Sequence, residues 1–416
     1  MLRLELPQAA GTLRLYSVPP AGAMAGTSGT ILRAMKVGIV VPYSWSFWGA
    51  VVEHAELQAA ALRDLGFEVR LIAGNDPPGS LTRVLHPRLG RHDSPPPELI
   101  PVGRSVIVPA NGSLPNVVLS PSTFFRLRAR LEREQFDVLH LHEPLTPVIG
   151  VTCLAVARTP IVATFHAAGT LAWNAVGKPL WGFLIERIDH RIAVSEQARE
   201  SVARHYPGEY EIVPNGVLIP PEADPTGRED RVVFVGRHEA RKGLHVLLRA
   251  WPAIHRRTGA RLRVAGAEPL AVRLLLHRLR VGDDGIDVLG FLSQEELTAE
   301  LLAAKVLAAP SLHGESFGMV LTRAFACATP VIASDIPGYS DVMSEDAGVL
   351  VRPGDPRALE DAVVGLLEDE ARRCELGERA RALASELYAW EAIAERLARI
   401  YEMVTGAARP RIAAVR

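Results

Sequence analysis

The chain has 416 residues, of which 48% are hydrophobic and 22% charged, a composition typical of a globular protein with two or three domains. Its formal net charge of −1 gives no general attraction for nucleic acid, so an anionic partner must be bound by a local basic patch. The three cysteines, Cys153, Cys327 and Cys374, are far apart and form no CxxC pair, which argues against a disulfide framework and a zinc site and favours the cytoplasm.

The first residues, 1–34, lack the charged start and continuous apolar stretch of a signal peptide. They are rich in Ala, Gly, Pro, Thr and Ser, and we interpret them as a disordered leader or as the product of an early start codon, with Met35 opening the folded protein. No apolar run in the sequence reaches the ~20 residues that a membrane span needs.

Short apolar runs rich in β-branched residues predict the strands of a first parallel sheet, at residues 37–41, 68–73, 137–142, 160–165 and 191–195. Apolar residues at helical spacing predict a helix over 51–65 that ends at Gly66, and another helix begins at Glu196. Strand, glycine-bearing loop, helix and strand form the βαβ unit of a doubly wound sheet. Residues 79–115, with many Pro and Gly, are expected to form a long irregular insertion.

The alternation of predicted strands and helices stops at residues 214–228, which we interpret as a linker, and then begins again. A helix is expected over 244–256, and further strands over 231–235, 261–265, 286–289, 306–309 and 330–333. We therefore predict an α/β protein with two Rossmann-like, doubly wound domains. Ligands of such sheets bind beyond the carboxyl ends of the strands, so two facing edges would enclose an interdomain cleft.

Two loops of the second domain carry residues suited to chemistry. Residues 236–243 bring Arg237, Lys242 and backbone N–H groups to a strand end, where they can hold a diphosphate. The alternative is a solvated basic turn, and the glycine spacing excludes a Walker loop. Residues 313–320 offer free N–H groups and Glu315, whose carboxylate can bond sugar hydroxyls. The alternative is a Glu in a first helical turn, favoured there by the helix dipole.

Three segments of the first domain carry weaker signals. His166, at a predicted strand end, can bond a sugar hydroxyl or a phosphate, or it is a structural histidine. The amides of residues 48–51 can reach a phosphate at the start of a helix. The helix predicted over 124–133 combines arginines with large apolar groups, which suits an anionic membrane surface or an ordinary amphipathic surface helix.

Taken in order, these segments resemble the family-4 glycosyltransferases of the GT-B fold, and within them the actinobacterial phosphatidylinositol mannosyltransferases. The resemblance runs from Met35 to about Val404. It rests on the loop that holds Arg237 and Lys242, and on residues 41–44, 111–113, 136–144, 161–166, 192–195, 214–217 and 314–318. It implies domains over 35–213 and 214–385, a helix over 386–405 that packs back on the first domain, and a tail over 406–416.

The resemblance also implies a role for each matching residue. Arg237 and Lys242 would neutralise the departing diphosphate, and Glu315 and His166 would contact the sugar. The other donor-binding residues would be Gly49, Ala50, Arg241, Gly290, Phe291, Leu292, Gly314, Ser316, Phe317, Gly318, Met319 and Arg323. On the acceptor side would lie Tyr43, His54, Asn111, Gly112, Ser113 and Asn116. Membrane contact would come from Phe124, Phe125, Arg126, Arg128, Arg130 and Arg133.

Enzymes of this kind keep the anomeric configuration and need no cofactor or metal ion, because the cations act electrostatically on the leaving group. The resemblance implies mannose transfer from GDP-mannose to a lipid or glycan acceptor such as phosphatidylinositol. It also implies a cytoplasmic protein that makes peripheral contact with anionic membrane on its inner face. Neither the oligomeric state nor a nucleic-acid partner is indicated.

Three positions depart from the family pattern. Arg323 stands where the family has a second glutamate for the ribose hydroxyls, and a guanidinium has no acceptor atom. Ala50 replaces the second glycine of a Gly-Gly-Val loop, and would be strained if that residue needed a positive φ. Asn116 replaces an arginine that suits a lipid phosphate.

These departures leave a second hypothesis open, a degenerate relative that binds a sugar nucleotide or a protein partner without turnover. A third is a non-hydrolysing sugar-nucleotide epimerase of similar architecture, which would need a set of acid/base carboxylates that the sequence does not locate.

Overall fold

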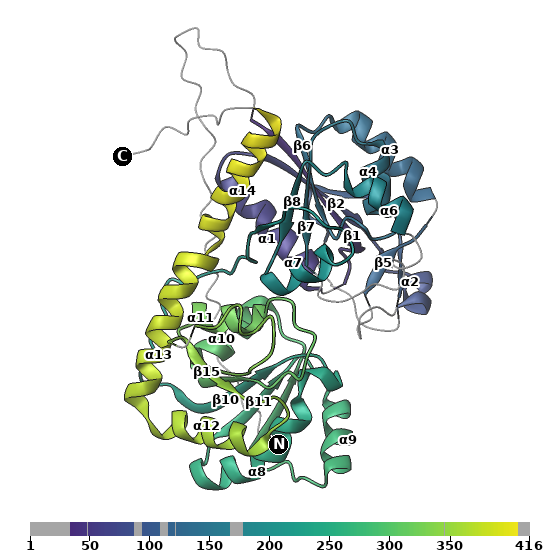
Figure 1. The fold of residues 1–416 in the computed structure, drawn as a ribbon. Coiled ribbons are helices and arrows are strands. Elements are labelled where there is room, and N and C mark those ends of the chain that lie inside the picture. The colour runs from purple at the N-terminus through teal and green to yellow at the C-terminus, as the bar shows by residue number, and fades with distance from the viewer. Residues whose placement is uncertain are drawn as a thin grey trace, which may run out of the picture. The chain divides into compact units, whose positions relative to one another are not determined.

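Two sheets flanked by helices organise the chain in this computed structural model (Figure 1). The structure describes residues 34–47, 49–86, 94–108, 115–120, 122–166, 178–344 and 346–406, with the backbone alone for 178–181. The predictions for residues 1–33, Trp48, 111–113 and 407–416 lie outside this range.

The first sheet has the strand order β3-β2-β1-β6-β7-β8-β9, and every pairing along this path is parallel. Its central strands are buried on both faces because helices cover both faces. The strands are β1 (Lys36–Ser44), β2 (Glu68–Gly74), β3 (Leu99–Pro101), β6 (Val138–His142), β7 (Ile161–Phe165), β8 (His190–Ala193) and β9 (Glu211–Ile212). The helices are α1 (Ala50–Asp64), α2 (Ser80–Leu85), α3 (Ser122–Glu134), α4 (Ile149–Val156), α6 (Lys178–Ile185) and α7 (Glu196–Ala203).

The segment over 79–115 is more regular than the sequence predicts. It contains α2, the edge strand β3, and β4 (Ser105–Ile107), which pairs antiparallel with β5 (Asn116–Val118). Asp76 accepts hydrogen bonds from the backbone N and hydroxyl of Ser105, at 3.2 and 2.7 Å, and so fixes the start of β4. Strands of only three residues, in a segment that is rich in proline, are too short for their sequence pattern to be recognised.

The second sheet is parallel throughout, in the order β12-β11-β10-β13-β14-β15. Its strands are β10 (Glu229–Val235), β11 (Arg261–Ala265), β12 (Ile286–Gly290), β13 (Ala304–Ala309), β14 (Val331–Ser334) and β15 (Gly348–Val351). The flanking helices are α8 (Leu244–Thr258), α9 (Pro269–Leu279), α10 (Gln294–Ala303), α11 (Met319–Ala326), α12 (Pro356–Glu368) and α13 (Glu370–Leu383). Each sheet therefore has the doubly wound topology that the sequence predicts.

The last helix, α14 (Trp390–Thr405), shares a core with the first sheet. A π-turn (Ala384–Tyr388) separates it from α13, and Val217 N donates to the Tyr388 carbonyl at 2.7 Å. Its buried side chains recur at helical spacing and pack with those of α1 and β1: Trp390, Ile393, Ala394, Leu397, Ile400 and Tyr401.

Candidate active site

The loop that follows β10 is pressed against the end of the neighbouring strand β13. Its short 3₁₀ turn (Ala240–Lys242) ends at Gly243, whose φ is 70°. A Cβ on Gly243 would lie 1.8 Å from the carbonyl oxygen of Pro310, so only glycine fits there. This close approach determines where Lys242 lies relative to the loop after β13.

Glu315, in the loop after β13, is the centre of an ion-pair cluster. Its Oε1 atom lies 2.7 Å from Lys242 Nζ and 3.2 Å from a guanidinium nitrogen of Arg241. Ser311 Oγ donates to the same oxygen at 3.0 Å, and Glu315 is buried. Two cations on one carboxylate leave a net positive charge at this strand end, which favours the binding of a phosphate group.

Helix α11 begins after Glu315 and not at it. Its N-cap is Gly318, with φ of 86°, and its first turn contains no acidic residue. The alternative interpretation of Glu315 as a first-turn residue is therefore wrong. A Cβ on Gly318 would lie 2.8 Å from a ring carbon of Tyr339, whose hydroxyl is 3.0 Å from Ser311 Oγ. Tyr339 and Ser311, which sequence analysis missed, thus hold the Glu315 loop.

Arg237 lies at the exposed side of the same loop. Its side chain is 43% exposed and pairs with Glu239 at 2.9 Å. Glu239 also pairs with Arg241 at 2.9 Å, so a chain of charges connects Arg237 to Glu315. Sequence analysis did not identify Glu239, which pairs with both Arg237 and Arg241.

Glycines follow strands β10 and β11 and end β12. Gly236 N donates to the Ala265 carbonyl at 2.9 Å, and Gly266 N donates to the Gly290 carbonyl at 2.6 Å. A Cβ on Gly266 would lie 3.1 Å from the Gly236 backbone. Phe291, which follows Gly290, is exposed, and its predicted contact with the base stays a prediction. Gly266 was missed because its only sequence signal is its place after a predicted strand.

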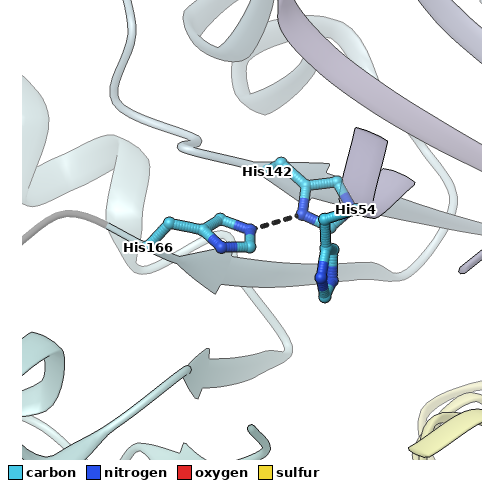
Figure 2. A group of neighbouring side chains, drawn as sticks. All are labelled: His54, His142 and His166. Carbon is cyan, nitrogen blue, oxygen red and sulfur yellow. Dashed lines mark hydrogen bonds between the residues drawn. The ribbon is translucent and has the colours of Figure 1, made fainter. Parts of the chain in front are cut away.

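Three histidines of the first sheet's core lie together (Figure 2). His54 comes from α1, His142 ends β6 and His166 follows β7. His142 Nδ1 is 2.8 Å from His166 Nε2, and the His54 ring centroid is 5.4 and 5.0 Å from those of His142 and His166. Strands β6 and β7 are parallel neighbours, so their carboxyl ends bring His142 and His166 to one edge. His142 was missed, although His140 and His142 alternate in the predicted strand.

Desolvation keeps these imidazoles neutral. Burial lowers the pKa of His54 and of His142 well below the usual histidine value, and it lowers the pKa of His166 to about 4. His140 stacks on His142 at 4.8 Å, and burial lowers its pKa to about 3. At neutral pH each ring therefore offers one N–H donor and one lone pair.

Arg323, on α11, forms an ion pair with Glu53 on α1. The two side chains are 22% and 16% exposed. The charge of Arg323 is therefore neutralised by a carboxylate from the first domain. Sequence analysis missed Glu53 because 270 residues separate the partners. A second contact joins the same two parts of the chain, since Ser195 Oγ donates to the Ser316 carbonyl.

Gly49 and Ala50 form the exposed start of α1. Gly49 is the N-cap in an extended conformation, with φ of −166°, and Ala50 is the first helical residue. Ala50 is absent from the described non-glycine residues with positive φ. The strain considered at Ala50 is therefore not present, because a first-turn helical position accepts alanine without a steric penalty.

The structure describes only some of the residues that were predicted to lie on the acceptor side. Asn111, Gly112 and Ser113 lie outside the described residues. Tyr43, in β1, pairs with Val117 of β5. Asn116 opens β5, and its Oδ1 atom lies 2.9 Å from His86 Nδ1. Asn116 thus has a protein partner in the position where the family's arginine would meet a lipid phosphate.

The predicted basic helix is α3. Thr123 and Leu127 are buried, whereas Phe125 is 72% exposed. All four of its predicted membrane-contact arginines are exposed: Arg126, Arg128, Arg130 and Arg133. Among the described helices, none is both long and apolar enough to cross a membrane.

Profiles of two glycosyltransferase families match this chain in succession. The profile described as Glycosyltransferase Family 4 matches residues 51–218, and the one described as Glycosyl transferases group 1 matches residues 229–369. The two matches together include both sheets' central strands except β1.

Several full-length relatives share about a third of their residues with this chain. Phosphatidyl-myo-inositol mannosyltransferase of Mycobacterium leprae is 35% identical over 89% of this chain and 97% of its own length. The protein of the same name from Mycolicibacterium smegmatis is 33% identical over 90% and 95%. D-inositol 3-phosphate glycosyltransferase of Xylanimonas cellulosilytica is 31% identical over 67% and 75%.

Solved structures support the fold. HepE of Anabaena, in complex with UDP and glucose, superposes with a TM-score of 0.66 at 18% identity, over 89% of this chain and 100% of its own. Sucrose-phosphate synthase of Thermosynechococcus elongatus gives 0.66 at 22% identity, over 90% and 100%. Both likenesses confirm the predicted GT-B architecture of two parallel-sheet α/β domains.

Proposed function

Because this chain belongs to the family-4 glycosyltransferases, we propose that it transfers a mannosyl group from GDP-mannose to a phosphatidylinositol-type lipid, with retention of anomeric configuration. The observation that carries the proposal is the cluster of Lys242 and Arg241 on Glu315 beside the glycine-bearing ends of the second sheet. The full-length relatives named phosphatidyl-myo-inositol mannosyltransferase support the choice of mannose and of acceptor.

The cations act on the donor's leaving group. As the bond between the sugar and the diphosphate breaks, negative charge grows on the diphosphate, and Arg237 and Lys242 neutralise it. Lys242 leaves its contact with Glu315 Oε1, 2.7 Å away in the free protein, and turns to the phosphate. This exchange needs no metal ion, because fixed cations provide the same electrostatic stabilisation.

Glu315 and His166 position the sugar. Once Lys242 has moved to the diphosphate, the Glu315 carboxylate accepts hydrogen bonds from sugar hydroxyls while Ser311 still holds its Oε1 atom. His166 is neutral at pH 7 because burial lowers its pKa to about 4, and its Nε2 atom, 2.8 Å from His142 Nδ1, can exchange that partner for a sugar hydroxyl. The amides at the start of α1, at Gly49 and Ala50, meet the phosphate.

The acceptor is held without the family's arginine. Asn116 is neutral and already bonds His86, so it adds no positive charge for a lipid phosphate. The exposed arginines of α3 provide that charge at the membrane surface instead. Recognition of the acceptor therefore depends on its presentation in a bilayer more than on a single phosphate contact.

The proposal is tested by incubating the purified chain with GDP-mannose and vesicles that contain phosphatidylinositol, and measuring mannosylated lipid by mass spectrometry. Matched reactions use UDP-glucose as donor, or D-inositol 3-phosphate as a water-soluble acceptor. We expect product with GDP-mannose and the vesicles. Product from the soluble acceptor alone would overturn the lipid assignment. Product from UDP-glucose alone would overturn the donor assignment, and donor binding without product in any reaction would favour the degenerate relative.

A further inference from the structure

His54, His142 and His166 lie close together, although they come from α1, from the end of β6 and from the residue after β7 (Figure 2). One nitrogen of each ring can be chosen so that all three lie within 4.8 Å of one another. His54 is 4% exposed and His142 is 1% exposed. Three imidazoles that converge in this way form a common ligand set for a transition metal.

The cluster also has unused hydrogen-bonding capacity. His54 Nδ1 is buried and has no hydrogen-bond partner among the residues that the structure describes. A buried polar atom without a partner costs free energy, so such atoms in a native fold call for an explanation. Neighbouring Asn215 interacts with the His166 ring through its side chain.

The protonation state suits a metal. Because desolvation lowers the pKa of all three rings, each is neutral at pH 7, which is the form of imidazole that binds metal ions. No proton has to leave the site when an ion enters. His142 Nδ1 and His166 Nε2 share one proton in their hydrogen bond, so the ring that donates it moves that proton to its other nitrogen when both atoms bind the ion.

We propose that His54, His142 and His166 form a binding site for Zn²⁺ or a similar divalent transition metal, with the fourth position open. Around a zinc ion at ~2.0–2.1 Å, tetrahedral ligands lie about 3.3 Å apart. The His142 and His166 nitrogens, now 2.8 Å apart, need only a small separation to reach that distance. A rotation of the His54 side chain on α1 brings one of its ring nitrogens to the position of the third ligand.

The ion would inhibit the enzyme. This consequence rests on the proposed function, in which His166 contacts the donor sugar. A His166 ring bound to zinc has no free lone pair for a hydroxyl, and the ion adds positive charge where the sugar must enter. Metal and donor therefore compete, and micromolar zinc would raise the apparent KM for the donor.

The test is a titration of chelator-treated protein with Co²⁺, whose visible absorption reports tetrahedral nitrogen coordination, and with Zn²⁺ by calorimetry. We expect one ion per chain, and a tenfold or greater loss of affinity in His54→Ala, His142→Ala and His166→Ala. His277→Ala, which changes an exposed histidine on α9, is the control and should bind as tightly as the wild type. Equal affinity in all four variants, or no stoichiometric binding, would overturn the site.

Two further measurements separate the possible failures. If a variant does not fold, zinc-edge X-ray absorption of the wild type counts imidazole ligands, and fewer than three would refute the proposal. Inhibition of transfer by Zn²⁺, reversed by EDTA, tests the competition. Metal binding in a protein that transfers no sugar would leave the site intact and would refute only the proposed function.

Discussion

The contact between Lys242 and Glu315 makes Lys242 the residue whose loss should affect transfer most. We expect Lys242→Ala to lower kcat/KM by roughly 10²–10³, because removal of one preorganised group that stabilises transition-state charge costs about 3–4 kcal/mol. Steady-state kinetics with the donor check this, with circular dichroism to show that the fold is kept.

Lys305→Ala is the matched control. Lys305 also pairs with a carboxylate, Asp230, at 2.5 Å, but it lies near the start of β13, whereas the Glu315 loop follows the end of that strand. Its variant should retain wild-type kinetics. If both lysine variants lose activity equally, or if neither does, the role of Lys242 is refuted.

The neutral histidines make stability depend on pH. His140 bonds Tyr401 at 2.6 Å and Thr164 at 2.7 Å, and its pKa is lowered to about 3. Unfolded histidine titrates near 6.5, so below that pH the unfolded chain binds the proton and the folded one does not. The contribution of neutral His140 to the free energy of unfolding is thus fully present above pH 6.5 and is lost as the pH falls toward 3.

We expect the free energy of unfolding to fall by about 1.4 kcal/mol per pH unit for each such histidine between pH 6 and 5. His140→Gln should reduce the slope of the free energy of unfolding against pH by the contribution of one histidine. His277→Gln, at an exposed position, should leave this slope unchanged. Urea denaturation at several pH values measures the slopes. Identical slopes for the wild type and His140→Gln would contradict the assignment.

At the scale of single elements, α3 is the part of the fold most suited to a membrane surface. Arg126, Arg130 and Arg133 recur at i, i+4 and i+7, so they share one face of the helix. If each adds about 1 kcal/mol to binding of an anionic surface, replacing all three by alanine weakens vesicle binding by about 150-fold. Flotation or surface plasmon resonance with anionic vesicles measures this change.

A triple alanine variant of Arg256, Arg273 and Arg278 is the control for charge alone, since these arginines are exposed on α8 and α9. We expect it to bind nearly as well as the wild type, and we expect added salt to weaken wild-type binding. Equal losses in the two triple variants would mean that net charge, and not the face of α3, governs the interaction.

At the scale of the whole molecule, the ion pair between Glu53 and Arg323 connects the two Rossmann-like domains. Arg323→Glu places two carboxylates side by side and should destabilise the contact, while the double variant Glu53→Arg/Arg323→Glu should restore it. A double-mutant cycle on thermal unfolding should give a coupling energy of 0.5 kcal/mol or more, to be compared with the ~0.5–3 kcal/mol of contacting residues.

Donor affinity in the same variants shows whether the pair also affects ribose recognition. Tighter donor binding in Arg323→Glu, together with a weaker interdomain contact, would mean that the new glutamate binds the ribose hydroxyls, as the family's second glutamate does, and that the ion pair with Glu53 has been lost. No measurable coupling and no change in donor affinity would show that the pair has neither role.

The sequence by itself determined the fold class, the family and most of the strand positions along the chain, because buried parallel strands are short apolar runs separated by helices. It also predicted Arg237, Lys242, Glu315 and His166 as site residues, because each lies in a segment that follows a predicted strand, and their roles stay predictions. Short edge strands such as β3 were not predictable, because three residues with a proline carry no periodic signal.

Only the tertiary structure decided which residues meet across long chain separations. It brought Glu53 to Arg323, His54 to His142 and His166, and Glu239 between two arginines. It also relieved the strain considered at Ala50 by making that residue the first of a helix. Such contacts depend on how parallel strand ends and separate helices are packed together, and a linear pattern of residue types does not record that packing.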